Sequence, residues 1–238
     1  MISQNLVAEI KSHALAEYPN ECCGIIVNGN IKDGVITGEY VRAENIAPDK
    51  HLQFKIDTRF CLEHEVTAIV HSHPNGPNCP SEADMQQQII SDLPWVIVST
   101  DGRNCLEPFA FGDMLPIPDL MRRPFQSGVT DCYDAIRHRL LEADIHLENF
   151  PREWGWWKTS NLYEDNLAKQ GFRILGEDEE LQKYDCFLLR LRSTKFNHGG
   201  VYLGEGLVYH HLGSDRDGSF SPTRLPVIEY GHRWLSLN

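Results

Sequence analysis

Between residues 112 and 128 the regular spacing of apolar side chains stops, and three prolines interrupt the chain. Proline fixes one backbone angle and lacks an amide donor, so a segment of this kind ends helices and strands. The charge balance changes at the same place: residues 1–118 hold 7 basic and 16 acidic side chains, whereas residues 119–238 hold 15 and 18. We interpret the segment as a linker between two domains, over residues 1–115 and 120–238.

The part before the linker mixes helical and extended periodicity, which predicts an α/β domain. Apolar side chains one helical turn apart predict a helix over residues 4–18, with Ser3 as its N-cap. Residues 28–30 have the turn sequence Asn-Gly-Asn. The other expected elements are strands over 23–27, 35–42, 67–73 and 95–99, and helices over 57–65 and from Ser81.

The part after the linker predicts an α+β domain, so the fold class of the whole chain is α+β. Its loop with Trp154, Trp156 and Trp157 either binds a sugar or peptide or packs into the core. The expected elements are helices over 131–143 and 160–170, the second ending at Gly171, and strands over 185–192, 198–204 and 207–213.

Composition excludes several classes of partner. With 22 basic and 34 acidic residues the net charge is −12, so we expect no nucleic acid and no anionic membrane as partner. No run of 18 apolar residues exists, and the first 18 residues lack the apolar centre of an export signal, so we expect no membrane insertion. Seven cysteines without a repeated spacing argue against a disulfide framework and for a reducing cytoplasm.

The first half contains a set of side chains that suits a metal ion. His71 and His73 are two residues apart on an expected strand, so both imidazoles point to one face. Asp84 follows in the first turn of the next expected helix. Two imidazoles and one carboxylate suit Zn²⁺ and leave a fourth tetrahedral position for water. Glu21, just before a strand, is the candidate general base for that water.

Each piece of this set also has a simpler interpretation. Ser81 and Asp84 have the spacing of a helix capping box, and a carboxylate in the first turn can cap and bind metal at once. A His-x-His pair alone is more often at the surface than at a metal. The combination with the preceding apolar strand favours the metal site.

The pattern of a distant Glu, His-x-His, ten residues and Asp, with a Ser three before the Asp, resembles the JAMM (MPN-type) metallopeptidases. The resemblance covers about residues 1–112. It implies a zinc hydrolase of amide or isopeptide bonds, in which His71, His73 and Asp84 bind the metal. It also implies that Glu21 is base and acid, and that Ser81 helps to polarise the scissile carbonyl.

The second half contains a candidate thiol nucleophile. Cys132 begins an amphipathic helix, where the helix dipole and unpaired amides favour a thiolate with a lowered pKa. A buried thiol at a helix start is the simpler alternative. Downstream, a hairpin is expected: a strict two-residue loop would put His198 and His210 on opposite faces, whereas the loop Gly204-Glu205-Gly206 sets His210 opposite Gly200. His198 then lies on the same face as His210, so the two can act as base and orienting residue.

This arrangement resembles the NlpC-type cell-wall cysteine endopeptidases, over about residues 120–238. The resemblance implies a papain-like α+β fold with Cys132 as nucleophile, His198 as base and His210 as third residue. It implies peptidoglycan stem peptides as substrate, cut at the γ-D-Glu to diamino-acid bond. Most members have Ser-Gly after Asp-Cys, whereas this chain has Tyr133 and Asp134, which puts the substrate groove in doubt.

Both domains in one chain of this size resemble the tail tip assembly proteins of lambda-type bacteriophages. This implies a protein made in the host cytoplasm that assembles with other phage tail tip proteins and can stay in the virion tail tip. We carry three hypotheses. The first is a hydrolase with two centres, the second a structural assembly factor with inactive peptidase folds, and the third a bacterial isopeptidase.

Overall fold

The computed structural model describes residues 1–117, 119–121, 123–212 and 232–237. Its contacts divide the chain into two compact units, Met1–Pro116 and Ile117–Asn238. None of the helices in these ranges is long and apolar enough to cross a bilayer.

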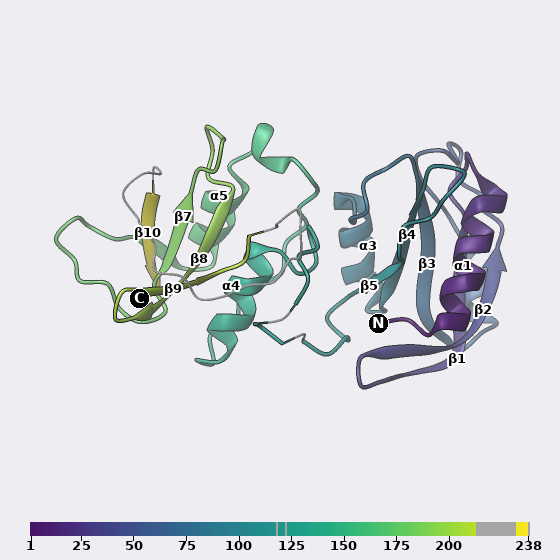
Figure 1. Cartoon of the computed structure of the whole chain (residues 1–238), viewed down its shortest axis with the longest axis horizontal. Helices are drawn as coiled ribbons and strands as arrows, with labels where there is room; N and C mark the ends of the chain where they lie inside the picture. The colour runs from purple at the N-terminus through teal and green to yellow at the C-terminus, as the bar shows by residue number, and fades with distance from the viewer. Residues whose placement is uncertain (118, 122, 213–231, 238) are drawn as a thin grey trace. The chain divides into compact units, whose positions relative to one another are not determined.

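The unit Met1–Pro116 builds one five-stranded sheet in the order β2-β1-β3-β4-β5. β3 and β4 are parallel, and the other neighbouring strands are antiparallel. α1 lies on one face of the sheet and α3 on the other (Figure 1). The elements are α1 Gln4–Glu17, β1 Cys23–Lys32, β2 Val35–Ala43, α2 Thr58–Leu62, β3 Val66–Pro74, α3 Glu82–Ser91, β4 Trp95–Thr100 and β5 Phe109–Phe111.

The core of this unit is built from the apolar side chains whose spacing predicted its helices and strands. α1 packs Leu6, Val7 and Ile10 against the sheet, which is the apolar stripe expected from its spacing. β4 is buried along its whole length, because a helix covers each face and no side chain of the strand reaches water. Ser3 occupies the N-cap position of α1, but its side chain makes no capping hydrogen bond.

The turn predicted at residues 28–30 is wrong. β1 continues to Lys32, and its pairing with β2 shifts between Val27 and Asn30, which is a β-bulge. Asn28 has a φ of +50°, a conformation that asparagine tolerates in bulges as well as in turns. The same local preference therefore serves a different structure, and the hairpin turn follows at Asp33 and Gly34.

The unit Ile117–Asn238 builds a second, fully antiparallel sheet in the order β6-β10-β7-β8-β9. Ile136 and Leu140 of α4 and Leu167 of α5 pack in one core with Leu188 and Val201 of the sheet. The elements are α4 Cys132–Leu141, a 3-10 turn Trp156–Lys158, α5 Leu162–Lys169, β6 Phe172–Ile174, β7 Cys186–Leu189, β8 His198–Gly204, β9 Leu207–His210 and β10 His232–Leu237.

Three expectations for the second half need correction. β6 and β10 were not expected, because three- and six-residue strands without clear alternation leave no local signal. The strand expected over 207–213 ends at His210, and residue 213 lies outside the described residues. Arg123 belongs to the segment interpreted as linker, yet it is only 1% exposed and pairs with Asp134 at 2.6 Å.

Candidate functional sites

The carboxyl end of β3 holds the first candidate site. His71 and His73 lie on β3, and Asp84 lies in the first turn of α3, the helix that connects the parallel strands β3 and β4. His71 Nε2 is 3.1 Å from His73 Nε2 and 3.2 Å from Asp84 Oδ1. His73 Nε2 is 3.2 Å from Asp84 Oδ2. The three side chains predicted to bind metal therefore meet at one point.

The size of this triangle fits zinc. Zinc holds nitrogen and oxygen ligands at about 2.0–2.2 Å, so two ligands of a tetrahedral ion lie about 3.3 Å apart. The two imidazole nitrogens are 3.1 Å apart, which is close to that edge, and each nitrogen lies 3.2 Å from a different oxygen of the Asp84 carboxylate. Burial would raise the pKa of Asp84, but the two adjacent imidazoles hold it well below its usual value. The carboxylate is thus ionised, as a metal ligand must be.

Each imidazole is fixed by a neighbour. His73 Nδ1 lies 3.1 Å from the carbonyl oxygen of Pro77, so Nδ1–H donates and the lone pair is on Nε2, the atom that faces Asp84. His71 is fully buried, and its ring is held by Phe54, stacked at 4.5 Å between centroids. Both rings therefore present Nε2 to the shared point.

Ser81 and Asp84 form the capping box that the spacing predicted. The Asp84 amide donates to Ser81 Oγ, and the Ser81 amide donates to Asp84 Oδ2 at 2.8 Å. The Ser81 hydroxyl also donates to Asp84 Oδ2, at 2.7 Å. The cap thus orients the carboxylate toward the imidazoles, and capping and ligation are compatible here. The direct contact of Ser81 is with Asp84.

Glu21 lies beside the triangle. β1 and β3 are antiparallel with Cys23 opposite His71, so continuing this register sets Glu21 opposite His73. The Glu21 side chain is buried, which raises its pKa to about 8, while the His73 charge acts in the opposite direction. A carboxyl group with that pKa can exchange protons near neutral pH.

The sequence analysis missed the residues that support this site. Asn45 donates through Nδ2 to the Glu21 carbonyl at 3.0 Å, and its Oδ1 accepts from the Ala47 and Lys55 amides. Phe54 and Pro77 hold the two imidazoles. None belongs to a spacing motif, although an Asn in a loop that follows a strand is a common side-chain anchor for backbone.

The second candidate site begins at the N-terminus of α4. Asp131 is the N-cap and accepts from the Tyr133 and Asp134 amides. Arg152 donates to both Asp131 oxygens, at 2.7 and 2.9 Å, and both side chains are buried. This pair fixes the start of the helix and therefore the backbone of Cys132.

The lowered pKa expected for Cys132 is wrong. The thiol is buried, and burial together with the adjacent Asp131 carboxylate raises its pKa to about 12. The amides at the helix start do stabilise a thiolate, but the free energy that a buried thiolate loses with its hydration is larger than that stabilisation. Cys132 is consequently a neutral thiol at rest.

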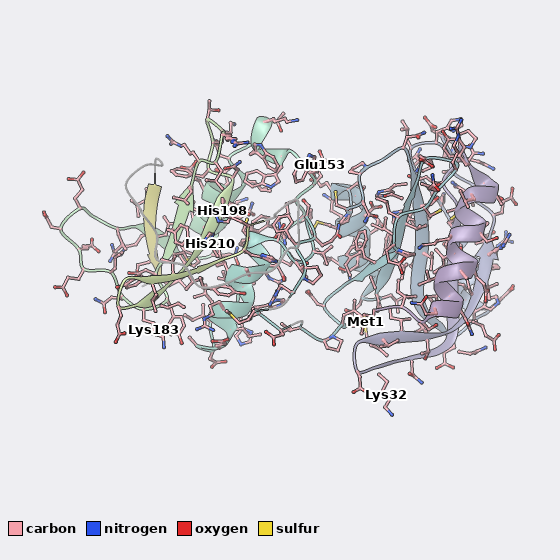
Figure 2. All side chains as sticks on the ribbon, viewed as in Figure 1. Met1, Lys32, Glu153, Lys183, His198 and His210 are labelled. Carbon is pink, nitrogen blue, oxygen red and sulfur yellow. The ribbon has the colours of Figure 1, made fainter. Side chains whose placement is uncertain are left out.

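His198 and His210 lie together on the adjacent strands β8 and β9 (Figure 2). Gly200 is opposite His210, as predicted, and His198 Nε2 is 2.9 Å from His210 Nδ1. The turn itself has two residues, and a bulge between Tyr202 and Gly204 restores the same-face register. Burial lowers the pKa of His198 to about 3 and of His210 to about 4, so both rings are neutral at physiological pH.

Cys132 approaches this histidine pair without bonding to it. The Gly199 amide, next to His198, donates to the sulfur, and Tyr163 Oη lies 2.9 Å from Sγ. Within the described ranges no hydrogen bond joins Sγ to His198. The structure thus brings the two histidines together and sets the sulfur against the same strand.

The residues that put the groove in doubt are inside the fold. Tyr133 is fully buried and its hydroxyl donates to the Glu148 carbonyl at 2.7 Å. Asp134 is buried and paired with Arg123. Of the tryptophans, Trp156 is buried and Trp154 is 58% exposed, so the loop holds both a core ring and a surface ring.

A family model described as prokaryotic homologs of the JAB domain matches residues 3–109. This range holds strands β1 to β4, the His71–His73–Asp84 triangle and Glu21, and the match confirms the JAB/MPN-type fold expected for the first half. The resemblance of residues 120–238 to NlpC-type endopeptidases stays a prediction.

Two relatives extend the similarity beyond that domain. Tail tip assembly protein K of Escherichia phage N15 is 31% identical over 220 residues, covering 88% of this chain and 85% of that protein. Tail tip assembly protein K of Escherichia phage lambda is 38% identical over 152 residues, covering 63% and 72%. A solved JAB1/MPN domain protein of Archaeoglobus fulgidus overlaps 44% of this chain and 85% of that chain at 24% identity and a TM-score of 0.29, which is too low to support a conclusion. The alignment to the N15 protein spans most of both chains, and this chain belongs to the family of tail tip assembly protein K.

Proposed function

We propose that this protein is a phage tail tip assembly protein with two hydrolytic centres. One is a zinc-dependent peptidase or isopeptidase in residues 1–115, and the other is a thiol-dependent peptidoglycan endopeptidase in residues 120–238. The observation that carries the first is the meeting of His71 Nε2, His73 Nε2 and the Asp84 carboxylate at 3.1–3.2 Å, with the buried Glu21 beside them.

In the first centre His71, His73 and Asp84 would hold zinc. Bound zinc supplies an acidified water and a Lewis acid for the scissile carbonyl. Glu21 takes a proton from the attacking water and returns it to the leaving amine, which its raised pKa permits. Ser81 holds the Asp84 carboxylate in place, and its resemblance-based role at the scissile carbonyl requires that its hydroxyl turn away from Asp84.

Zinc analysis of the purified protein tests the metal centre. We expect about one zinc per chain, and a loss of most of it in His73→Ala, because two donors remain. A matched substitution, His51→Ala, removes an exposed imidazole of the same unit and should leave the zinc content unchanged. A parent protein without zinc after purification in zinc-containing buffer would favour the structural assembly hypothesis.

In the second centre Cys132 is the nucleophile. His198 takes the thiol proton as the sulfur attacks the carbonyl carbon, and later gives it to the leaving amine. Water then cleaves the thioester and regenerates the thiol. His210 accepts from His198 Nε2–H, so the lone pair needed for the base is on His198 Nδ1.

Digestion of Gram-negative sacculi tests the thiol centre. The full chain should release fragments cut at the γ-D-Glu to diamino-acid bond, in the presence of a chelator and a reductant, because acyl transfer to sulfur requires no metal. Cys132→Ala should release none. Cys186→Ala changes another buried thiol of the same unit and should keep the activity if the protein is folded. Digestion by Cys132→Ala at the parent rate would exclude this centre.

We further propose that the protein acts with other tail tip proteins in the host cytoplasm and reaches the virion tail tip. The support is the family, whose two relatives named above are tail tip assembly proteins. Complementation of a phage that lacks its own copy separates the roles. If Cys132→Ala and Glu21→Gln both restore infectious tails at the parent level, assembly is structural and the hydrolytic centres are not needed for it.

A further inference from the structure

Tyr163 is a residue that no motif connects to the thiol centre, yet its hydroxyl touches the sulfur. Tyr163 Oη lies 2.9 Å from Cys132 Sγ, across 31 positions of sequence. Tyr163 begins the buried face of α5 and is 2% exposed, and Cys132 is 6% exposed. Both belong to the hydrophobic cluster that includes Trp156 and Phe150, and the buried charges of Asp131 and Arg152 act on both side chains.

The direction of this hydrogen bond follows from the inventory of partners. A buried hydroxyl needs an acceptor, and among the described residues the only side-chain partner of Tyr163 Oη is Sγ of Cys132. If the thiol were the donor, the tyrosine proton would have no acceptor in the core. Tyr163 therefore donates to sulfur, and the thiol proton is available to a base. Burial keeps the pKa of Tyr163 well above its usual value, so the hydroxyl stays protonated.

We propose that Tyr163 is a catalytic residue of the thiol centre, whose hydroxyl stabilises the thiolate as it forms on Cys132. The inference rests on the proposed thiol peptidase function. The S–H bond breaks, the proton goes to the His198 imidazole, and the electron pair stays on sulfur while the Tyr163 O–H bond stays intact. A hydrogen bond to an anion is stronger than one to a neutral acceptor, so the contact gains strength as the charge appears. The Gly199 amide, which also donates to the sulfur, acts in the same direction.

The hydroxyl can be removed without the ring. The Tyr163 ring packs against Trp156 at 4.6 Å and Tyr133 at 5.9 Å between centroids, contacts that a phenylalanine retains. Tyr133 provides a matched control in the same core. It is also fully buried, but its hydroxyl donates to the Glu148 carbonyl and accepts from Gln170, away from the sulfur.

The experiment measures alkylation of Cys132 by iodoacetamide in the full chain over a pH series, with the labelled peptide quantified by mass spectrometry. Losing one hydrogen bond to a charged group lowers the thiolate fraction at a given pH by about 10- to 100-fold. A thiolate of higher pKa is intrinsically more nucleophilic, which recovers about half of that on a logarithmic scale. Tyr163→Phe should therefore react about 3- to 10-fold more slowly, and Tyr133→Phe should follow the parent.

Two outcomes would overturn the proposal. One is a Tyr163→Phe profile that overlaps the parent profile, and the other is an equal shift in both variants, which would show a packing effect. If Tyr163→Phe does not fold, replacement of Tyr163 by 3,5-difluorotyrosine tests the same hydrogen bond. Its hydroxyl is a stronger donor and should speed the alkylation of Cys132. An unchanged or slower rate contradicts the proposal. Alkylation needs no substrate, so it reports on Tyr163 even if sacculus digestion fails and the peptidase function with it.

Discussion

At the scale of single residues, a substitution at Glu21 tests whether the proposed catalysis can be separated from metal binding. Its carboxyl group faces the triangle from the β1 side and is not one of the three atoms that define it. We expect Glu21→Gln to keep the zinc content of the parent and to lose hydrolysis by at least about 100-fold, which is the usual contribution of a general base. Zinc analysis and peptidase assays on one preparation measure the zinc content and the loss of hydrolysis together. Loss of zinc together with activity would make Glu21 a ligand instead.

The histidine pair predicts how acid affects stability. Burial holds the pKa values of His198 and His210 at about 3 and 4, below the value of about 6.5 in an unfolded chain. Above pH 6.5 the pair adds no pH dependence. As the pH falls below 6.5, both imidazoles become protonated in the unfolded chain but stay neutral in the folded protein. The free energy of unfolding therefore falls by about 1.4 kcal/mol per pH unit for each ring, down to about pH 4.

Urea unfolding followed by tryptophan fluorescence measures this, since four of the five tryptophans lie in residues 117–238. The double variant His198→Asn, His210→Asn should show a flatter dependence between pH 6.5 and 4. An equally steep dependence in the variant would assign the acid sensitivity to other groups.

At the scale of elements, the first turn of α3 links helix capping to metal affinity. Ser81→Ala removes the side-chain cap, at a cost of about 1 kcal/mol to stability, and removes one of the two Ser81 hydrogen bonds that orient the Asp84 carboxylate. We expect zinc affinity to fall by about 10- to 100-fold, as it does when a group that orients a ligand is lost. Asp57→Ala removes the cap of α2 and should lower stability without changing zinc affinity. A chelator competition titration compares the two.

The β8–β9 hairpin depends on one glycine. A Cβ on Gly200 would lie 2.2 Å from the Tyr209 carbonyl oxygen and 2.7 Å from His210 Cβ, so the strands must separate. Gly200→Ala should lower stability by about 1–3 kcal/mol and break the His198–His210 contact, with loss of activity. Gly206 has a φ of +75°, and a Cβ added there would meet no atom within 4 Å. Gly206→Ala should therefore lower stability by about 1 kcal/mol through backbone strain and leave the NMR signals of the His198 and His210 imidazoles unchanged. Unchanged signals in Gly200→Ala would contradict this.

The elements also show how far sequence reasoning reached. The meeting of His71, His73 and Asp84 was predictable, because β-strand alternation and a helix cap fix these side chains locally. The register of Gly200 and His210 was predicted from a three-residue loop, but the structure reaches it through a two-residue turn and a bulge between Tyr202 and Gly204. The protonation state of the Cys132 thiol could not be predicted from the sequence. Its pKa depends on burial in a cluster with Tyr163 and Trp156, which are distant in the sequence. Asn45 and Arg152 act through non-local bonds that leave no spacing pattern.

At the scale of the whole chain, part of the segment interpreted as a linker, residues 112–128, belongs to the second unit. Arg123 pairs with the buried Asp134 at 2.6 Å. Arg123→Met leaves that carboxylate with weaker partners, and we expect a loss of about 3 kcal/mol in the unfolding free energy of the second unit. Arg173→Met breaks a pair whose side chains are 42% and 43% exposed and should cost less than about 1 kcal/mol. Urea unfolding of both variants measures the two losses in unfolding free energy. Equal losses would contradict the expected difference between the buried and the exposed ion pair.

The burial of Cys132 has a consequence for the lifetime of the protein. Peroxide and air attack thiolates that solvent can reach, and convert them through sulfenic acid to forms that cannot be recovered. A sulfur that is 6% exposed and protonated at rest offers neither access nor charge. The environment that keeps the Cys132 thiol neutral therefore also protects it from oxidation.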